Sequence, residues 1–218
     1  MSIPPRDWNS HPPYLSPDYK STTLRGPTQP PVPLEAPALI NSGPCFGAEV
    51  VEPLDNDLTR NARVNGEPLG ERILVTGRVL DEMGRPQPDT LVEIWQADAK
   101  GFYNSPSETR GQADPNFTGW GRCPSDMESG EFVFETIKPG IVPFKDGRPM
   151  APHITFWVVA RGINIGLHTR LYFSDEEAAN AADPVLSRIE HRHRVPTLIG
   201  QRDGNDIRFD IHLQGDNE

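Results

Sequence analysis

Proline and glycine are the residues that most constrain the fold of this chain. Its 218 residues include 24 prolines and 19 glycines, spread over the whole length. Proline has no backbone N–H and a fixed φ, and glycine weakens helices and strands, so both interrupt regular elements. The sequence therefore predicts short strands joined by many turns rather than a bundle of long helices.

The prolines are densest in the first 44 residues. This density excludes a sustained helix or a central strand. The segment also carries large apolar side chains, among them Trp8, Tyr14 and Leu34, which a freely solvated linker seldom has. We predict an extended Pro-rich arm over residues 1–44, which wraps over the body of the protein or over a partner subunit. One domain is expected to follow over residues 45–218.

Six stretches after the arm have the composition of β-strands, because they are rich in β-branched and aromatic residues and end at turn residues. The first two are interpreted as a β-hairpin, with the turn Gly-Arg-Pro at 84–86 between them. In the sixth, apolar residues alternate and are expected to face inward. The predicted strands cover residues 72–80, 90–96, 131–137, 154–160, 171–173 and 206–213.

A helix is predicted to begin where Ser174 precedes a run of acidic residues and alanines that ends at Ala181. Serine is a favoured N-cap, and carboxylates stabilise the first turn of a helix. Residues 184–190 are a candidate for another helical turn. The sum of these elements is an all-β fold, a β-sandwich core with one or two short helices.

One histidine stands at the start of the apolar strand near residue 154. Alternation along a strand puts His153, Thr155 and Trp157 on one face. A His-x-His pair there would place two imidazoles side by side as metal ligands, but the second position is a threonine. The strand therefore carries half of a metal-binding motif, or a single histidine that is satisfied by hydrogen bonds in a core.

Charge and composition exclude several classes of function. The formal net charge is −10 and there is no basic patch, which argues against nucleic-acid binding. The chain has no apolar run long enough for a membrane helix, and its start lacks the apolar core of a signal peptide, so a cytoplasmic location is expected. Cys45 and Cys123 have no metal-ligand spacing. Two inert thiols are the favoured interpretation, and a disulfide stays open.

Four motifs together resemble the intradiol ring-cleavage dioxygenases over nearly the whole chain. They are GERILVTGRVLD at 70–81, LVEIWQAD at 91–98, IKPG at 137–140 and TRLYF at 169–173. The resemblance implies a β-sandwich core and non-haem Fe(III). It also implies an assembly of αβ protomers in which the β chain carries the iron. The implied reaction is cleavage of protocatechuate by O2 to 3-carboxy-cis,cis-muconate.

The resemblance also implies an iron held by two tyrosinates and two histidines. Tyr103 matches the first tyrosine and His153 the first histidine, whereas Val142 and Thr155 stand at the other two positions. Phenolates are hard anionic donors that stabilise ferric iron, and valine has no donor atom. We therefore expect no metal and no catalytic residue on this chain itself, with the Fe(III) of the holoenzyme on a partner β chain.

Other positions are assigned by the same resemblance. Segments 150–154 and 160–165 resemble the α chain, whereas the arm and residues 114–122 resemble the β chain. Gly43 and Pro44 match a turn that the α chain presents at the partner's active-site cleft, and the alternative is an ordinary turn. Arg161 is a candidate partner for a substrate carboxylate, and the alternative is an inter-subunit salt bridge. Arg170 stands where the β chain has a pocket glutamine and has the same ambiguity.

Three functions follow from these observations. The first is an α-type subunit that completes the assembly and the cleft of an iron-bearing β chain. The second is a non-enzymatic scaffold or binding β-sandwich that keeps only the fold, since such sandwiches support many functions. The third is an active homo-oligomeric dioxygenase that uses unexpected ligands.

Overall fold

The computed structural model describes residues 51–218 except residues 63, 89, 161–162, 164–165 and 216. The predicted arm over residues 1–44 lies outside the described residues and stays a prediction. In the described part, the helical elements are α3 (Glu177–Ala182), η3 (Leu186–Arg188) and η4 (Arg192–Leu198), and the last two are 3-10 helices. The strands are β1 (Arg72–Leu80), β2 (Leu91–Trp95), β3 (Trp120–Pro124), β4 (Glu131–Ile137), β5 (Val142–Pro143), β6 (Pro149–Met150), β7 (His153–Val159), β8 (Leu167–Phe173), β9 (Ile199–Asp203), β10 (Asp206–Arg208) and β11 (Ile211–His212).

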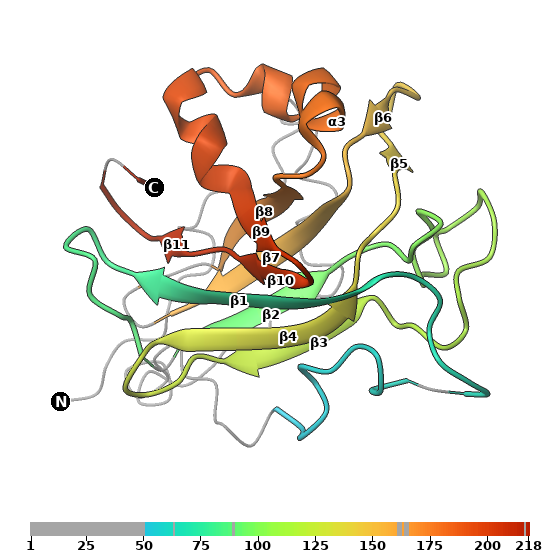
Figure 1. Ribbon diagram of the computed structural model, residues 1–218, viewed down its shortest axis with the longest axis horizontal. Coiled ribbons are helices and arrows are strands. Elements are labelled where there is room, and N and C mark those ends of the chain that lie inside the picture. Colours follow the sequence, from blue (N-terminus) through green and yellow to red (C-terminus); the bar gives the residue numbers. More distant parts are fainter. Residues whose placement is uncertain (1–50, 63, 89, 161–162, 164–165, 216) are drawn as a thin grey trace, which may run out of the picture. The chain divides into compact units, whose positions relative to one another are not determined.

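The strands form two layers that are joined through β9 (Figure 1). One layer has β4, β1, β10 and β9 side by side, and β11 continues the pairing of β1. The other has β9, β8, β7, β2 and β3. β9 is parallel to β8 and antiparallel to β10, so it belongs to both layers. The predicted all-β sandwich is confirmed.

The core lies between the two layers. In β7 the side chains of Ile154, Phe156 and Val158 are buried there, as the alternation predicted. Phe132 and Phe134 from β4 meet Phe156 with ring centroids 5.9 Å and 6.5 Å away. Tilted aromatic pairs at this spacing are favourable beyond the area they bury. The last predicted strand divides into β10 and β11, and its alternating apolar residues do face the core: Ile207, Phe209, Ile211 and, partly buried, Leu213.

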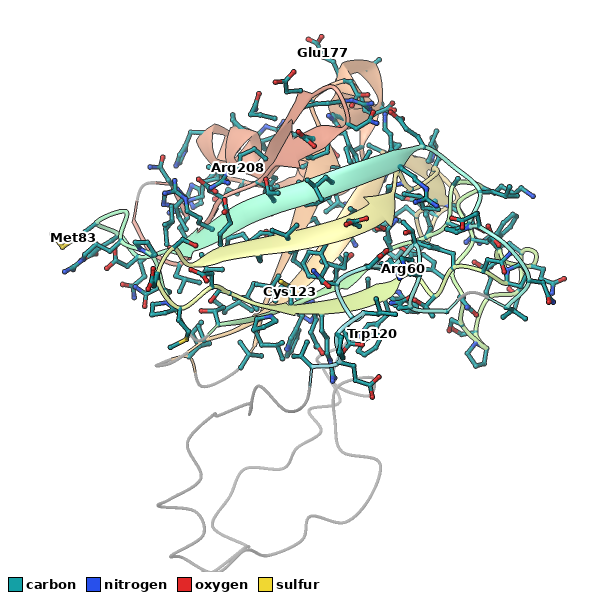
Figure 2. All side chains as sticks on the ribbon, turned by 60° about the horizontal axis from the view of Figure 1, so that its bottom comes forward. Arg60, Met83, Trp120, Cys123, Glu177 and Arg208 are labelled. Carbon is teal, nitrogen blue, oxygen red and sulfur yellow. The ribbon has the colours of Figure 1, made fainter. Side chains whose placement is uncertain are left out.

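Cys123 on β3 also belongs to the core, and Figure 2 labels its position. Its thiol is free and buried, and burial raises its pKa. A thiol with a raised pKa is a weak nucleophile, which agrees with the interpretation of an inert cysteine. Cys45 lies outside the described residues.

The predicted hairpin of the first two strands is wrong. β1 pairs with β4, β10 and β11, whereas β2 pairs with β3 and β7 in the other layer. The turn itself exists, since the backbone N–H of Gly84 donates to Asp81 at 3.0 Å. After this turn Pro86 bridges to Leu80, and the backbone N–H of Gln87 donates to Val79 at 2.8 Å. The chain then crosses to the second layer without forming a second strand along β1. One edge of β1 pairs with β4 over seven residues, so that edge is not free to pair with β2.

A further prediction needs correction, and a polar segment contains an additional strand. Helix α3 begins after Glu176, and Ser174 is not its N-cap. The Ser174 hydroxyl instead accepts the backbone N–H of Arg202 from β9, at 3.2 Å. The long segment 100–126 has the polar composition of a loop, and the structure shows that it contains β3. Gly121 and Pro124 are poor strand formers, so this strand depends on its pairing with β2.

The two long edge strands are covered by a short segment at residues 55–61. The backbone N–H of Arg122 in β3 donates to Asp55, and that of Glu135 in β4 donates to Asn56, both at 2.9 Å. The segment therefore satisfies backbone groups on both edges at once. On an uncovered edge these groups would bond to solvent or to another chain.

In the described part of the chain, every helix is too short or too polar to cross a bilayer.

Candidate functional site

The candidate site lies on the outer face of the second layer. Cross-strand partners share a face, so the antiparallel register puts Trp95, Thr155 and Arg170 in one row across β2, β7 and β8. His153 and Tyr172 form the next row. These residues alternate with the core residues of β7 and β8, which confirms that His153 and Thr155 share a face away from the core.

Two small apolar clusters enclose this face from either side. One is built on the two-stranded sheet β5–β6, and the other on α3 and the helical turns after it (Figure 1). They bury polar side chains of the site in surroundings of low polarity, which makes unpaired charges costly. The first cluster contains Ala97, Val142, Met150, Tyr103, Phe144 and Val185, and the second contains Ala151, Tyr172, Leu186 and their neighbours.

Tyr103 is carried by the loop after β2, and Asp98 organises that loop. The buried Asp98 carboxylate accepts the backbone N–H groups of Lys100 and Phe102, both at 2.9 Å. The Tyr103 ring stacks on Trp95 with centroids 5.8 Å apart and planes at 9°. Burial raises the pKa of the Tyr103 phenol, although the nearby Arg170 opposes this shift. The phenol is therefore protonated at neutral pH.

Glycine is required where this loop meets β5. Gly101 has φ +82°, and an added Cβ would lie 2.0 Å from the carbonyl oxygen of Ile141. No other residue permits both this backbone conformation and this approach. Gly101 thereby sets the distance between the loop that carries Tyr103 and the strand that carries Val142.

His153 is held in a defined tautomer. Its Nδ1 lies 2.7 Å from the carbonyl oxygen of Ala151, and because a carbonyl only accepts, Nδ1 carries the proton. The backbone N–H of Ala151 in turn donates to the buried Asp183 at 2.8 Å. Burial lowers the pKa of His153, and Arg170 lowers it further, so the imidazole is neutral with a lone pair on Nε2.

The Nε2 atom of His153 is buried and has no hydrogen-bond partner among the described residues. No hydrogen bond joins the described side chains of Tyr103 and His153. An imidazole with one N–H fixed by a carbonyl and the other nitrogen free is the arrangement that metal-binding histidines use. The half-motif interpretation is thus compatible with the local geometry of this residue.

The donor set as a whole does not fit a ferric ion. Val142 is buried in β5 and offers only hydrocarbon, and Thr155 offers a neutral hydroxyl where an imidazole would stand. That leaves Tyr103 and His153 as donors, beside the cationic side chain of Arg170. Within the described ranges, no group of three or more His, Cys, Asp or Glu is arranged to hold a metal ion.

Sequence reasoning placed Arg170 at a pocket position by resemblance, and the structure places it among the candidate ligand positions of this chain. Its Nη1 lies 3.7 Å from the sulfur of Met150. Its charge opposes the burial that raises the pKa of Tyr103, and it adds to the burial that lowers the pKa of His153. The alternation of β8 was visible in the sequence. The register between β7 and β8, which places Arg170 opposite Thr155, was not.

A cavity of about 360 Å³ opens beside Tyr103 and Trp95. Val142 and Pro143 line one side of it, and the loop residue Arg110 lines another. Arg110 forms an ion pair with Glu108 and donates to the carbonyl oxygen of Gly101 at 2.8 Å. The cavity is therefore bounded by aromatic, aliphatic and already paired charged groups.

The three positions predicted to form a substrate cleft, Gly43, Pro44 and Arg161, lie outside the described residues. A further arginine, Arg148, pairs its guanidinium with Asp146 at 2.8 Å. His191 and His193, the second His-x-His in the chain, are exposed.

Comparison with protein families gives two matches. A family model described as "Dioxygenase" matches residues 41–215. A model described as "Protocatechuate 3,4-dioxygenase beta subunit N terminal" matches residues 5–36. The second match agrees with the β-like character predicted for the arm.

Similar curated proteins include both chains of one two-chain enzyme. The chain is 48% identical to a protocatechuate 3,4-dioxygenase beta chain from Burkholderia cepacia over 188 residues, covering 84% of this chain and 79% of that one. It is 46% identical to an alpha chain of the enzyme of that name from Pseudomonas putida over 153 residues, covering 68% and 74%. Resemblance to both types of chain is thus confirmed.

Solved structures with the same fold include two dioxygenases. The 3-chlorocatechol 1,2-dioxygenase of Rhodococcus opacus 1CP superposes with a TM-score of 0.51 at 21% identity, covering 69% of this chain and 63% of that one. An intradiol ring-cleavage dioxygenase from Tetranychus urticae gives 0.50 at 22% identity, covering 80% and 94%. At these identities the likeness concerns the fold.

Proposed function

Because the chain belongs to the intradiol ring-cleavage dioxygenase family, we propose that it is an α-type subunit of a protocatechuate 3,4-dioxygenase. The holoenzyme would open the ring of protocatechuate between its two hydroxyls, with both atoms of O2 entering the product 3-carboxy-cis,cis-muconate. The catalytic Fe(III) would be held by a partner β chain. This chain would complete the assembly and the wall of the partner's cleft.

The observation that carries this proposal is the donor set of the candidate site. Tyr103 and His153 are retained, Val142 and Thr155 bring no suitable donor, and Arg170 adds a positive charge. Ferric iron is a hard cation that depends on anionic donors, so losing a phenolate costs charge as well as a bond. The isolated chain is therefore expected to be inactive.

The type of chain is argued from chemistry rather than from similarity. The Burkholderia cepacia beta chain matches over a longer stretch than the Pseudomonas putida alpha chain, and identity is nearly equal. Similarity to both supports a multi-chain assembly. The α-type role rests on the two missing donors, which a metal-bearing chain would need.

Residues outside the described ranges complete the proposal. Gly43 and Pro44 would form a turn at the rim of the partner's cleft, where glycine permits close approach of backbone to substrate. Arg161 would pair its guanidinium with the carboxylate of protocatechuate in two-point fashion. These roles come from the family resemblance and are tested separately below.

Expression with and without a partner tests the main proposal. The chain alone is expected to contain no stoichiometric iron and to show no tyrosinate-to-iron absorption. Together with a β chain that has two tyrosines and two histidines, it should form a stable complex that consumes O2 when protocatechuate is added. An isolated chain that is iron-loaded and active would contradict the proposal. A β chain that forms no complex with it, and whose activity is unchanged by it, would support a scaffold instead.

Substitution in the complex tests the cleft role of Arg161. Arg161→Gln should raise KM for protocatechuate about tenfold or more, because a charge-assisted pair is lost. The iron content and the turnover of catechol, which has no carboxylate, should not change. Arg148→Gln is the matched control, since Arg148 already pairs with Asp146. Equal effects of the two variants would refute the role.

A further inference from the structure

The two positions that lack a donor are connected to one side chain, Arg170, directly in one case and through Met150 in the other. Thr155 is its direct cross-strand partner between β7 and β8. Val142 is the cross-strand partner of Met150, whose sulfur lies 3.7 Å from Nη1 of Arg170. The guanidinium thus extends from the row of one missing donor toward the row of the other.

The retained donors surround the same cation. Burial raises the pKa of Tyr103 and the charge of Arg170 opposes that rise, whereas burial and Arg170 both lower the pKa of His153. Burial likewise raises the pKa of Tyr172, the cross-strand partner of His153, and a hydrogen bond from Arg170 opposes it. Three groups around Arg170 are therefore the remains or the neighbours of a metal site, and each of them is neutral at pH 7.

Arg170 differs from the other arginines near this face. Arg110 pairs with Glu108, and Arg122 pairs with Glu93 at 2.6 Å. No ion pair joins Arg170 to a carboxylate in the described part of the chain, although its side chain is only partly exposed. The buried Asp183 carboxylate lies 3.5 Å from the hydroxyl of Tyr172, and it already accepts three backbone N–H groups. A partly buried charge without a direct counter-ion is costly, so its presence at this place calls for a function.

We propose that Arg170 supplies the positive charge of this site in place of a metal ion, and that it excludes metal ions from it. The inference rests on the proposed function, in which this chain carries no iron, and it adds a reason why the chain binds none. His153 has Nδ1 on a carbonyl oxygen and no hydrogen-bond partner for Nε2 among the described residues, so one intact ligand of the site is present. A guanidinium among the donor positions repels an incoming cation, and low polarity strengthens the repulsion.

It follows that restoring the missing donors is not sufficient to restore metal binding. The donor set of V142Y/T155H would be complete, yet Arg170 would still be the cross-strand partner of position 155 and contact Met150, the partner of position 142. Replacing Arg170 by glutamine keeps the length and the hydrogen-bonding capacity of the side chain and removes its charge. Lysine keeps the charge and changes the shape, so it serves as the matched control.

The experiment compares V142Y/T155H, V142Y/T155H/R170Q and V142Y/T155H/R170K in the purified chain. Zn²⁺ is titrated by calorimetry, and iron is supplied as Fe²⁺ in air and followed by metal analysis and tyrosinate-to-iron absorption. The R170Q variant should bind Zn²⁺ at least about 100-fold more tightly than the other two. It alone should develop the iron absorption band.

Because Val142 is buried, a tyrosine there risks misfolding. T155H and T155H/R170Q form a second pair of variants that leaves β5 unchanged. In this pair Zn²⁺ would be bound by three donors, Tyr103, His153 and the new histidine. Here too only the variant without Arg170 should bind. Circular dichroism and thermal unfolding identify the pair that is folded, and that pair decides the outcome.

Each result is decisive. Equal Zn²⁺ affinity with and without Arg170 overturns the inference, as does a folded R170Q variant that binds no metal. Tight binding by the R170K variant overturns it as well, since charge would then not be the barrier. All three leave the proposed function intact. Stoichiometric iron in the unmodified chain would instead defeat the proposed function.

Discussion

The ring of Tyr103 lies flat against the ring of Trp95, with centroids 5.8 Å apart and an angle of 9° between the planes. The contact joins a loop residue to the strand β2, at the edge of the cavity beside the candidate site. It fixes the phenol beside a site in which Val142 and Thr155 bring no suitable donor. Packing against Trp95 sets the orientation of this side chain.

Trp95→Leu should loosen the loop that carries Tyr103. The substitution keeps an apolar side chain but removes the stack, which contributes about 1 kcal/mol beyond area burial. Trp95→Phe keeps an aromatic ring and should lose less. Urea unfolding measures both, and near-UV circular dichroism should weaken in the leucine variant. Equal losses in both variants would show that stacking is unimportant.

Gly101→Ala should be among the most damaging single substitutions in this chain. The added Cβ would meet the Ile141 carbonyl at 2.0 Å, and φ is +82°. Gly84→Ala is the control, because its φ is +74° and nothing lies within 4 Å. We expect Gly84→Ala to cost about 1 kcal/mol from backbone strain alone, and Gly101→Ala at least about 2 kcal/mol more. Similar melting temperatures would disprove the close contact.

Asp183→Ala should destabilise the fold around His153. The carboxylate is fully buried and accepts the backbone N–H groups of Ala151, Val185 and Leu186 at 2.7 to 2.8 Å. Leaving these donors unpaired should cost about 3 kcal/mol or more in unfolding free energy. Asp183→Asn keeps an oxygen acceptor and should cost less than half of that. An alanine variant as stable as the asparagine variant would contradict this account.

Acid should remove one stabilising contact of the Tyr103 loop. The hydrogen bond from Arg110 holds the pKa of Glu108 at about 2, well below its usual 4.5. A lowered pKa means that the folded state favours the carboxylate, so the stabilisation is complete above about pH 4.5 and is lost as the pH falls toward 2.

Glu108→Gln makes this testable. The variant should be less stable than the unmodified chain at neutral pH, and the difference in melting temperature should shrink steadily below about pH 4.5. A difference that stays constant between neutral pH and about pH 3 would show that the ionised form of Glu108 has no special role.

Strands with strong local signals were predictable from the sequence. β1 and β4 have the predicted bounds, and β2 and β7 differ by one residue at their ends. β3 was not predictable, because its residues have little strand propensity and the pairing with β2 decides their structure. The hairpin error has the same origin. A turn at Gly84 was visible, but the choice between local and distant pairing depends on the whole sheet.

The candidate site was predictable in part. Tyr103, Val142, His153 and Thr155 were identified by motif, and the outer face of β7 by alternation. The position of Arg170 required the register of β8 against β7, and the role of Asp183 required the fold of the segment after α3. Such contacts join residues that are distant in sequence and leave no local pattern. Gly43, Pro44 and Arg161 lie outside the described residues, and their cleft role stays a prediction.

The segment at residues 55–61 determines how this molecule can associate. Since its backbone already occupies the edges of β3 and β4, another polypeptide cannot extend the sandwich there by adding a strand. Subunits that meet this region have to recognise side chains instead of main-chain groups. Recognition of that kind is specific to sequence, so closely related chains can diverge in the companions they accept while the architecture stays the same.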